Sequence, residues 1–151
     1  MHDILATPTD TKRLTLEFVL NGQPFGAMVE EDTSLMDLLR GQAGLISPKN
    51  GCAPQGSCGC CTVIVGDKAV SSCAVPAKNV VGKSVLTLEG LDPHARNIYA
   101  KAFTLAAGSQ CGFCIPGIVV RAKHLLHNNP TPSRDEIARS LNNHICRCTG
   151  Y

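Results

Sequence analysis

Nine cysteines dominate the chemistry that this chain could perform, because eight of them fall into two sets of four. In the later set, a Cys-x-x-Cys turn at Cys111 and Cys114 precedes a Cys-x-Cys turn at Cys146 and Cys148. Residues 115–145 are enough for a helical hairpin that folds the second pair back onto the first. Four thiolates gathered in this way hold either a zinc ion or an iron–sulfur cluster. Two such sets indicate electron transfer more than a structural staple.

The earlier set contains Cys52, Cys58, Cys61 and Cys73. Plant-type ferredoxins hold a [2Fe–2S] cluster with a Cys-x4-Cys-x2-Cys loop and a distant fourth cysteine. The loop here follows that pattern but is one residue longer between Cys52 and Cys58. Its glycines let the backbone bend tightly and turn N–H groups toward the sulfides of a cluster. Zinc remains an alternative at both sites, although zinc ribbons usually pair two Cys-x-x-Cys knuckles.

The ninth cysteine, Cys60, is adjacent to Cys61 in the same loop. If Cys61 is a ligand, the side chain of Cys60 must point away from the site, which favours a buried, small hydrophobic residue. The alternative is that Cys60 replaces Cys61 as the ligand. An odd number of clustered cysteines argues against a complete set of disulfides and favours metal or redox work in a reducing compartment.

The bulk composition is that of a globular protein, with 44% hydrophobic and 17% charged residues. A net charge of +2 without a basic run gives no support to nucleic-acid binding. No apolar stretch approaches the roughly 18–20 residues that span a bilayer. The first 13 residues lack an apolar signal core and a twin-arginine pair, so we expect a cytoplasmic protein. No ligand spacing relates the five histidines to one another: His2, His94, His124, His127 and His144.

The first half of the chain predicts a small mixed sheet with one helix across it. After a loose arm at 1–12, apolar residues alternate from Arg13 to Leu20, which is the period of a strand. Asn21–Gly22 is a strong hairpin signal, and Ser34 can cap a helix. A cysteine-bearing loop at 47–59 follows that helix. The other strands are expected at 23–29, 62–65, 68–72 and 85–88.

The second half predicts a helical bundle, beginning near residue 90. Asp92–Pro93 caps a helix that extends to about residue 107, with Ile98, Ala102 and Leu105 facing inward. A second helix runs from Pro116 to about residue 128. The capping box at 133–136 opens a third helix with Ile137 and Leu141 on its inner face. A last turn presents Cys146 and Cys148.

Two motifs of the helical half resemble a known family when they are read together. These are Gln110-Cys-Gly-Phe-Cys-x-Pro-Gly117 and Cys146-Arg-Cys-Thr-Gly-Tyr151. They are similar to the small iron–sulfur subunit of the molybdenum hydroxylases, the family of xanthine dehydrogenase, aldehyde oxidoreductase and carbon monoxide dehydrogenase. Cys58-Gly-Cys-Cys-Thr-Val63 is similar to the family's Cys-Gly-Ala-Cys-Thr-Val, with Cys60 at the alanine position. The resemblance covers residues from about 13 to 151, and the family's chains usually continue further.

The resemblance implies an α+β protein, with a β-grasp ferredoxin-like domain at 13–90 and a four-helix bundle at 91–151. Each domain would hold one [2Fe–2S] cluster. The ligands of the first cluster would be Cys52, Cys58, Cys61 and Cys73. The ligands of the second cluster would be Cys111, Cys114, Cys146 and Cys148.

The resemblance also implies a hetero-oligomer with no substrate active site on this chain. A large subunit would bind molybdopterin, with Gln110 bonded to the pterin and Cys148 at the contact between cluster and pterin. Electrons would pass from molybdenum to the helical cluster, then to the β-grasp cluster, and then to FAD on a medium subunit. The competing readings are a free two-cluster ferredoxin and a zinc-stabilised interaction module. Ferredoxins tend to be acidic, whereas this chain is slightly basic.

Overall fold

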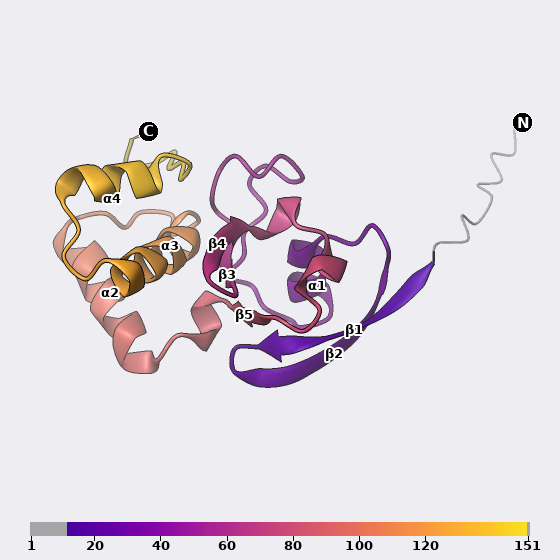
Figure 1. Ribbon diagram of the computed structural model, residues 1–151. Helices are drawn as coiled ribbons and strands as arrows, with labels where there is room; N and C mark the ends of the chain where they lie inside the picture. Colours follow the sequence, from indigo (N-terminus) through magenta and orange to yellow (C-terminus); the bar gives the residue numbers. More distant parts are fainter. Residues whose placement is uncertain (1–11, 151) are drawn as a thin grey trace, which may run out of the picture.

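A computed structural model describes residues 12–150, in which a five-stranded mixed sheet precedes three α-helices (Figure 1). The strand order is β2-β1-β5-β3-β4; β1 and β5 are parallel, and the other neighbours are antiparallel. Figure 1 shows the C-terminal helices gathered beside the β3–β4 edge, with the β1–β2 hairpin at the opposite edge. Tyr151, His2 and most of the expected N-terminal arm lie outside the described residues.

The first hairpin forms as the alternation of apolar residues predicts. Strands β1 (Arg13–Leu20) and β2 (Gln23–Glu30) pair along their whole lengths. Leu16, Phe18 and Leu20 are buried, and the residues between them are exposed. The turn residues Asn21 and Gly22 have φ angles of 52° and 83°, the left-handed conformation that a two-residue hairpin turn requires.

Helix α1 (Leu35–Gly41) supplies much of the core against the sheet. The Ser34 side chain accepts a hydrogen bond from the Asp37 N–H at 3.1 Å, so the predicted N-cap is confirmed. Leu35, Leu38 and Leu39 are almost completely buried among the strand residues. Burying a leucine side chain contributes about 1.5–3 kcal/mol, so these three side chains hold the helix on the sheet.

The second hairpin and the last strand place the cysteine loop at one end of the sheet. Strand β3 (Thr62–Val65) pairs with β4 (Lys68–Ser71) on one side and with β5 (Ser84–Leu86) on the other. The last strand was expected to continue to Leu88, but Leu88–Gly90 form a 3₁₀ turn instead. The buried Thr87 side chain just before it forms hydrogen bonds with Asn21 and Glu89, which tie this turn to the first hairpin.

Three α-helices follow the sheet: α2 (Pro93–Leu105), α3 (Ile115–Asn128) and α4 (Arg134–Leu141). The Asp92 cap and the capping box of Ser133 and Glu136 are both confirmed. Helix α3 packs on β3, β4 and α4, whereas α2 packs only lightly on the rest of the described chain. Within residues 12–150, none of the helices combines the length and the apolar character that crossing a bilayer requires.

The expected inner face of α2 is wrong. Ile98 and Leu105 are 53% and 88% exposed, and Ala102 is exposed as well. The half-buried stripe of the helix instead carries Tyr99 and Phe103. Periodicity shows that a helix has an apolar stripe, but not whether its own core or another surface covers that stripe.

The inner face of α4 and the predicted bundle are supported less fully than the helices themselves. Ile137 is 42% exposed, contrary to expectation, while Leu141 is half-buried. The described residues after α4, 142–150, form turns, so they add no fourth helix to the three after the sheet. The α+β class is confirmed, and the four-helix bundle and the boundary near residue 90 stay predictions.

The Glu89 carboxylate joins the turn after β5 to the start of the cysteine loop. It accepts hydrogen bonds from the Ile46 and Ser47 N–H groups at 3.1 and 2.8 Å. The hydroxyls of Ser47 and Thr87 donate to it at 2.5 and 2.6 Å. Burial opposes the charged form, but the hydrogen bonds from Ser47 and Thr87 outweigh burial and lower the pKa of Glu89.

We therefore expect Glu89→Gln to destabilise the protein by about 1–3 kcal/mol near neutral pH. A lowered carboxyl pKa adds stability above the unfolded value of about 4.3, and this stability is lost as pH falls through the folded pKa. The difference in unfolding temperature between Glu89→Gln and the native chain should therefore shrink in acid. Glu31→Gln is the control, because the Glu31–Lys78 pair is surface-exposed and screened by solvent, so its loss should change stability little. A difference that stays constant with pH would contradict this assignment.

Candidate metal centres

The pairing of β3 with β4 brings two cysteines of the first set together. Thr62 opposes Ser71, so Cys61 and Cys73, which lie just beyond them, are neighbours at the end of the hairpin. The Cys73 N–H points at the Cys61 sulfur at 3.5 Å. Both side chains are buried beside Met36. The Ser72 hydroxyl donates to the Cys61 carbonyl at 2.7 Å and fixes the loop at this point.

The other two cysteines of the first set meet inside the long loop. The Cys58 N–H donates to the Cys52 sulfur at 3.3 Å. Burial raises the pKa of the Cys52 thiol, but hydrogen bonds from Ser57 and Cys58 outweigh it and lower this pKa to about 7. Gly51 leaves space beside them, since a Cβ at that position would lie 3.0 Å from the Cys58 sulfur. The close approach of the backbone to the thiols explains why glycine precedes Cys52.

The second set forms where α3 begins and the chain ends. Cys114 is the N-cap residue of α3 and is buried, whereas Cys111 and Cys148 are exposed. The Thr149 N–H and hydroxyl lie 3.3 and 2.8 Å from the Cys146 sulfur. These contacts from Thr149 lower the pKa of the Cys146 thiol to about 7.

The eight thiols group into four pairs, two pairs to a site, with the partners in hydrogen-bonding reach of each other. These pairs are Cys52 with Cys58, Cys61 with Cys73, Cys111 with Cys148, and Cys114 with Cys146. In a [2Fe–2S] cluster each iron takes two protein ligands, which matches two pairs to a site. A structural zinc ion needs four ligands around one point. The paired donor set therefore fits a [2Fe–2S] cluster.

Within a pair, the two thiols do not ionise equally. Burial and the neighbouring thiol Cys146 raise the pKa of Cys114 to about 11, while the pKa of Cys146 is lowered. The Phe113 N–H lowers the pKa of Cys111, and the Cys111 thiol raises that of its partner Cys148. One thiolate of each such pair thus forms readily, and the second needs a cation to replace its proton.

The loop of the first site is in direct backbone contact with both segments of the second site. The Ile145 N–H donates to the Cys58 carbonyl at 3.1 Å. Gly117, in the first turn of α3, leaves no room for a side chain, because a Cβ there would collide with the Gly59 carbonyl. Gly59 has a φ of 69°, and a Cβ there would lie 2.6 Å from the Asn143 carbonyl oxygen. These contacts hold the two candidate centres beside each other.

His144 lies at this contact, which no pattern in the sequence predicts. Its Nε2 is 3.2 Å from the Thr62 hydroxyl, which itself donates to the Gly59 carbonyl at 2.7 Å. Because that hydroxyl has one proton, we assign Nε2–H as the donor to Thr62. Burial, together with the nearby Arg121, lowers the pKa of His144 to about 4, so the ring is neutral near pH 7. The spacing of the five histidines along the sequence indicated no metal site. The packing role of His144 becomes visible only in the folded structure.

Two further residues of the sequence analysis, Gln110 and Cys60, differ in their exposure to solvent. Gln110 is exposed and directly precedes the exposed Cys111, at the open side of the second site. Cys60 is buried, as expected for a small hydrophobic residue. The structure pairs Cys61, rather than Cys60, with Cys73, which supports Cys61 as the ligand.

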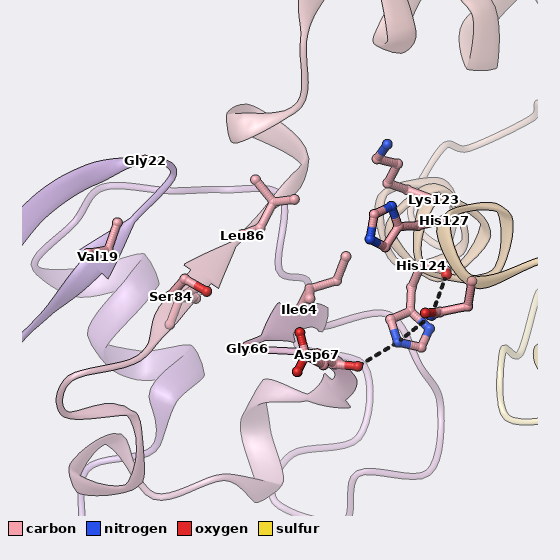
Figure 2. A pocket seen from close by; sticks show the side chains of 12 residues that line it. Val19, Gly22, Ile64, Gly66, Asp67, Ser84, Leu86, Lys123, His124 and His127 are labelled. Carbon is pink, nitrogen blue, oxygen red and sulfur yellow. Dashed lines mark hydrogen bonds between the residues drawn. The ribbon is translucent and has the colours of Figure 1, made fainter.

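A separate cavity of about 450 Å³ lies between the sheet and α3, away from the cysteines (Figure 2). Lys123, His124 and His127 approach it from α3, opposite strand residues such as Ile64. The His124 ring is half-buried and contacts the Asp67 carbonyl at 2.9 Å, whereas His127 is exposed.

Two family comparisons cover most of the chain. Residues 18–87 match the 2Fe-2S iron-sulfur cluster binding domain, and residues 87–151 match the [2Fe-2S] binding domain. The chain is 38% identical over 140 residues to the nicotinate dehydrogenase small FeS subunit of Eubacterium barkeri, covering 92% of this chain and 88% of the relative. It is 42% identical to the aldehyde oxidoreductase of Megalodesulfovibrio gigas, but spans only 15% of that protein.

Solved structures give the same result at the level of the fold. The chain superposes on a chain of quinoline 2-oxidoreductase from Pseudomonas putida 86 with a TM-score of 0.84 and 36% identity. This match covers 92% of the present chain and 86% of the other. Aldehyde oxidoreductase from Desulfovibrio gigas gives a TM-score of 0.83 at 39% identity, with 16% of its chain covered.

The contact at Gly117 generates a stability prediction. Gly117→Ala should lower the unfolding temperature, with a cost of about 1–3 kcal/mol, because the added methyl group meets rigid backbone. Gly41→Ala is the matched control: Gly41 is also helical, and a Cβ there meets nothing within 4 Å. Alanine has the better helix propensity, so the control should be neutral or more stable by up to about 1 kcal/mol. Equal unfolding temperatures for the two variants would show that the two halves do not touch at Gly117.

Proposed function

Because the chain belongs to the family of small [2Fe–2S] iron–sulfur subunits of the molybdenum hydroxylases, we propose that it relays electrons between two partner subunits. The relay would run from a molybdopterin-binding large subunit to an FAD-binding medium subunit. The observation that carries this proposal is the grouping of eight thiols into four pairs at two adjoining sites. A free two-cluster ferredoxin is less supported, since relatives that match along most of their length are named as subunits.

The residues proposed to hold the first cluster come from the loop and the second hairpin. They are Cys52, Cys58, Cys61 and Cys73. The second cluster is assigned to Cys111, Cys114, Cys146 and Cys148. When bound, the clusters supply sites that accept and release single electrons. The chain itself supplies thiolate ligands, shields the first site by burial, and fixes the spacing of the sites through Gly59 and Gly117.

The exposure of the second site supports its assignment as the entry point for electrons. Cys111 and Cys148 are exposed, whereas Cys58, Cys61 and Cys73 of the first site are buried. Large apolar side chains are also exposed around the second site, with Phe113 at 42% and Ile145 at 41%. A site of this kind is shielded only when a partner covers it. We assign that cover to the molybdopterin-binding subunit, with Gln110 bonded to the pterin and Cys148 beside it.

The finer architecture and the cellular setting belong to the same proposal. The sheet half would be the β-grasp domain, at 13–90, and the helical half the four-helix bundle of the family, at 91–151. Substrate oxidation is assigned to the partner and not to this chain, so the substrate class of the complex is set elsewhere. The abundance of unpaired cysteines fits a reducing cytoplasm.

The direct test is the metal content of protein prepared anaerobically with sufficient iron. We expect about four iron atoms and as many sulfides per chain, as two [2Fe–2S] clusters. The reduced protein should give two distinguishable electron paramagnetic resonance signals, because one site is buried and the other exposed. Zinc bound at either site under these conditions would refute the proposal.

Gln110→Ala tests the orientation of the chain in the complex. Its amide offers a donor and an acceptor at the open side of the second site, so its loss should weaken docking on the pterin. Both clusters should assemble normally, while reduction of the second cluster by substrate should slow several-fold in rapid-mixing spectroscopy of the complex. Gln23→Ala, an exposed glutamine of β2, should change neither quantity. If the first cluster were reduced before the second, the orientation would be reversed.

A further inference from the structure

We propose that Cys60, which is not a ligand, is the contact through which an electron crosses from one cluster site to the other. This inference rests on the proposed function, and it gives a role to a thiol that the two ligand sets leave unused. No covalent change at Cys60 is involved. One electron leaves the reduced cluster of the second site and reduces the oxidised cluster of the first, and the Cys60 thiol is neither oxidised nor reduced.

The position of Cys60 carries the inference. Its side chain is 5% exposed and belongs to one buried group with Cys58 of the first site and Cys114 of the second. Its sulfur lies 3.6 Å from the Cys58 carbonyl oxygen and within reach of the Cys58 thiol. Cys60 thus packs in one buried group with proposed ligands of both sites.

The surroundings keep the Cys60 sulfur in this place. The Cys60 carbonyl accepts a hydrogen bond from the Lys49 N–H at 3.1 Å. Gly51 packs beside the sulfur, since a Cβ there would lie 3.6 Å from it and 3.4 Å from the Phe113 ring. Gly117 of α3 packs against the Cys60 backbone, since a Cβ at Gly117 would lie 3.1 Å from the Cys60 Cα. Loop and helix therefore hold this side chain from several sides.

A second route for the electron runs through the backbone between the two sites. It follows the hydrogen bond from the Ile145 N–H to the Cys58 carbonyl and then the backbone to Cys146. That route crosses a long run of covalent bonds between the two ligand sulfurs. The route through Cys60 passes from Cys114 to Cys60 to Cys58, three side chains that pack in one buried group. Electron tunnelling weakens exponentially across empty space, and a large, polarisable sulfur atom closes the gap better than a methyl group.

The test is the rate of electron exchange between the clusters in the full chain carrying both of them. A light flash with a photoreductant introduces one electron, and rapid freezing followed by electron paramagnetic resonance tracks its passage from one signal to the other. Cys60→Ala should keep both clusters and slow the exchange several-fold. The magnetic interaction between the two reduced clusters should stay the same, because their separation is set by the backbone contacts.

Two control variants accompany Cys60→Ala. Val80→Ala opens a comparable void in the sheet core, where Val80 is fully buried, and should leave the exchange rate unchanged. Cys61→Ala should lose the first cluster, which shows that Cys60 does not replace that ligand. If electron exchange between the clusters is also slower in Val80→Ala, the effect of Cys60→Ala reflects a general loosening of the protein core. That result would overturn the inference.

The remaining outcomes separate the inference from the function on which it rests. An unchanged rate in Cys60→Ala would place the path on the Ile145 hydrogen bond and overturn the role of Cys60, while the relay function stands. Loss of a cluster in Cys60→Ala would make Cys60 a ligand, and an altered magnetic interaction would mean that the clusters had moved; either result overturns the inference. Native protein whose two clusters do not exchange electrons would instead refute the proposed relay.

Discussion

The close approach of two backbone segments, at Gly59 and Gly117, holds the two candidate cluster sites together. The first cysteine loop and the start of α3 touch with no side chain between them. Backbone contact of this kind cannot relax by a change of rotamer, so it fixes distance more firmly than a contact between flexible side chains. The hydrogen bond from Ile145 to the Cys58 carbonyl adds the C-terminal turn to the same junction. Two sites that lie far apart in sequence thereby become neighbours.

Electron transfer between the two sites and the stability of the fold both require close, fixed packing at this junction. An electron carrier needs its two sites close together and unchanging in separation, and the packed glycines provide both conditions. His144 contributes from the other side: its neutral ring covers Gly59 and bonds to Thr62 at the start of β3. The cost is a low tolerance for substitution, since any side chain at Gly59 or Gly117 would push the sites apart.

The helical half leaves part of its apolar surface unburied. Leu105 is 88% exposed and Ile98 is 53% exposed on the lightly packed α2, and the thiols Cys111 and Cys148 of the same half are exposed as well. The sheet half differs, because its apolar residues close over a core around Leu35, Leu38 and Leu39. This contrast agrees with the proposal that a partner subunit covers the helical half.

The sequence alone determined the local elements and the chemistry of the sites. Strand alternation, the Asn21–Gly22 turn, the Ser34 cap and the capping box at Ser133 depend on neighbouring residues, so they could be predicted without the fold. The spacing of the cysteines likewise predicted two sets of four, and the family comparisons support that division. The folded structure was needed to show which thiols pair, that Cys60 packs with cysteines of both sets, and that His144 packs on Gly59. It also placed Ile98 and Leu105 outside, contrary to the helical pattern. These features depend on contacts between segments far apart in the chain, which no local periodicity encodes.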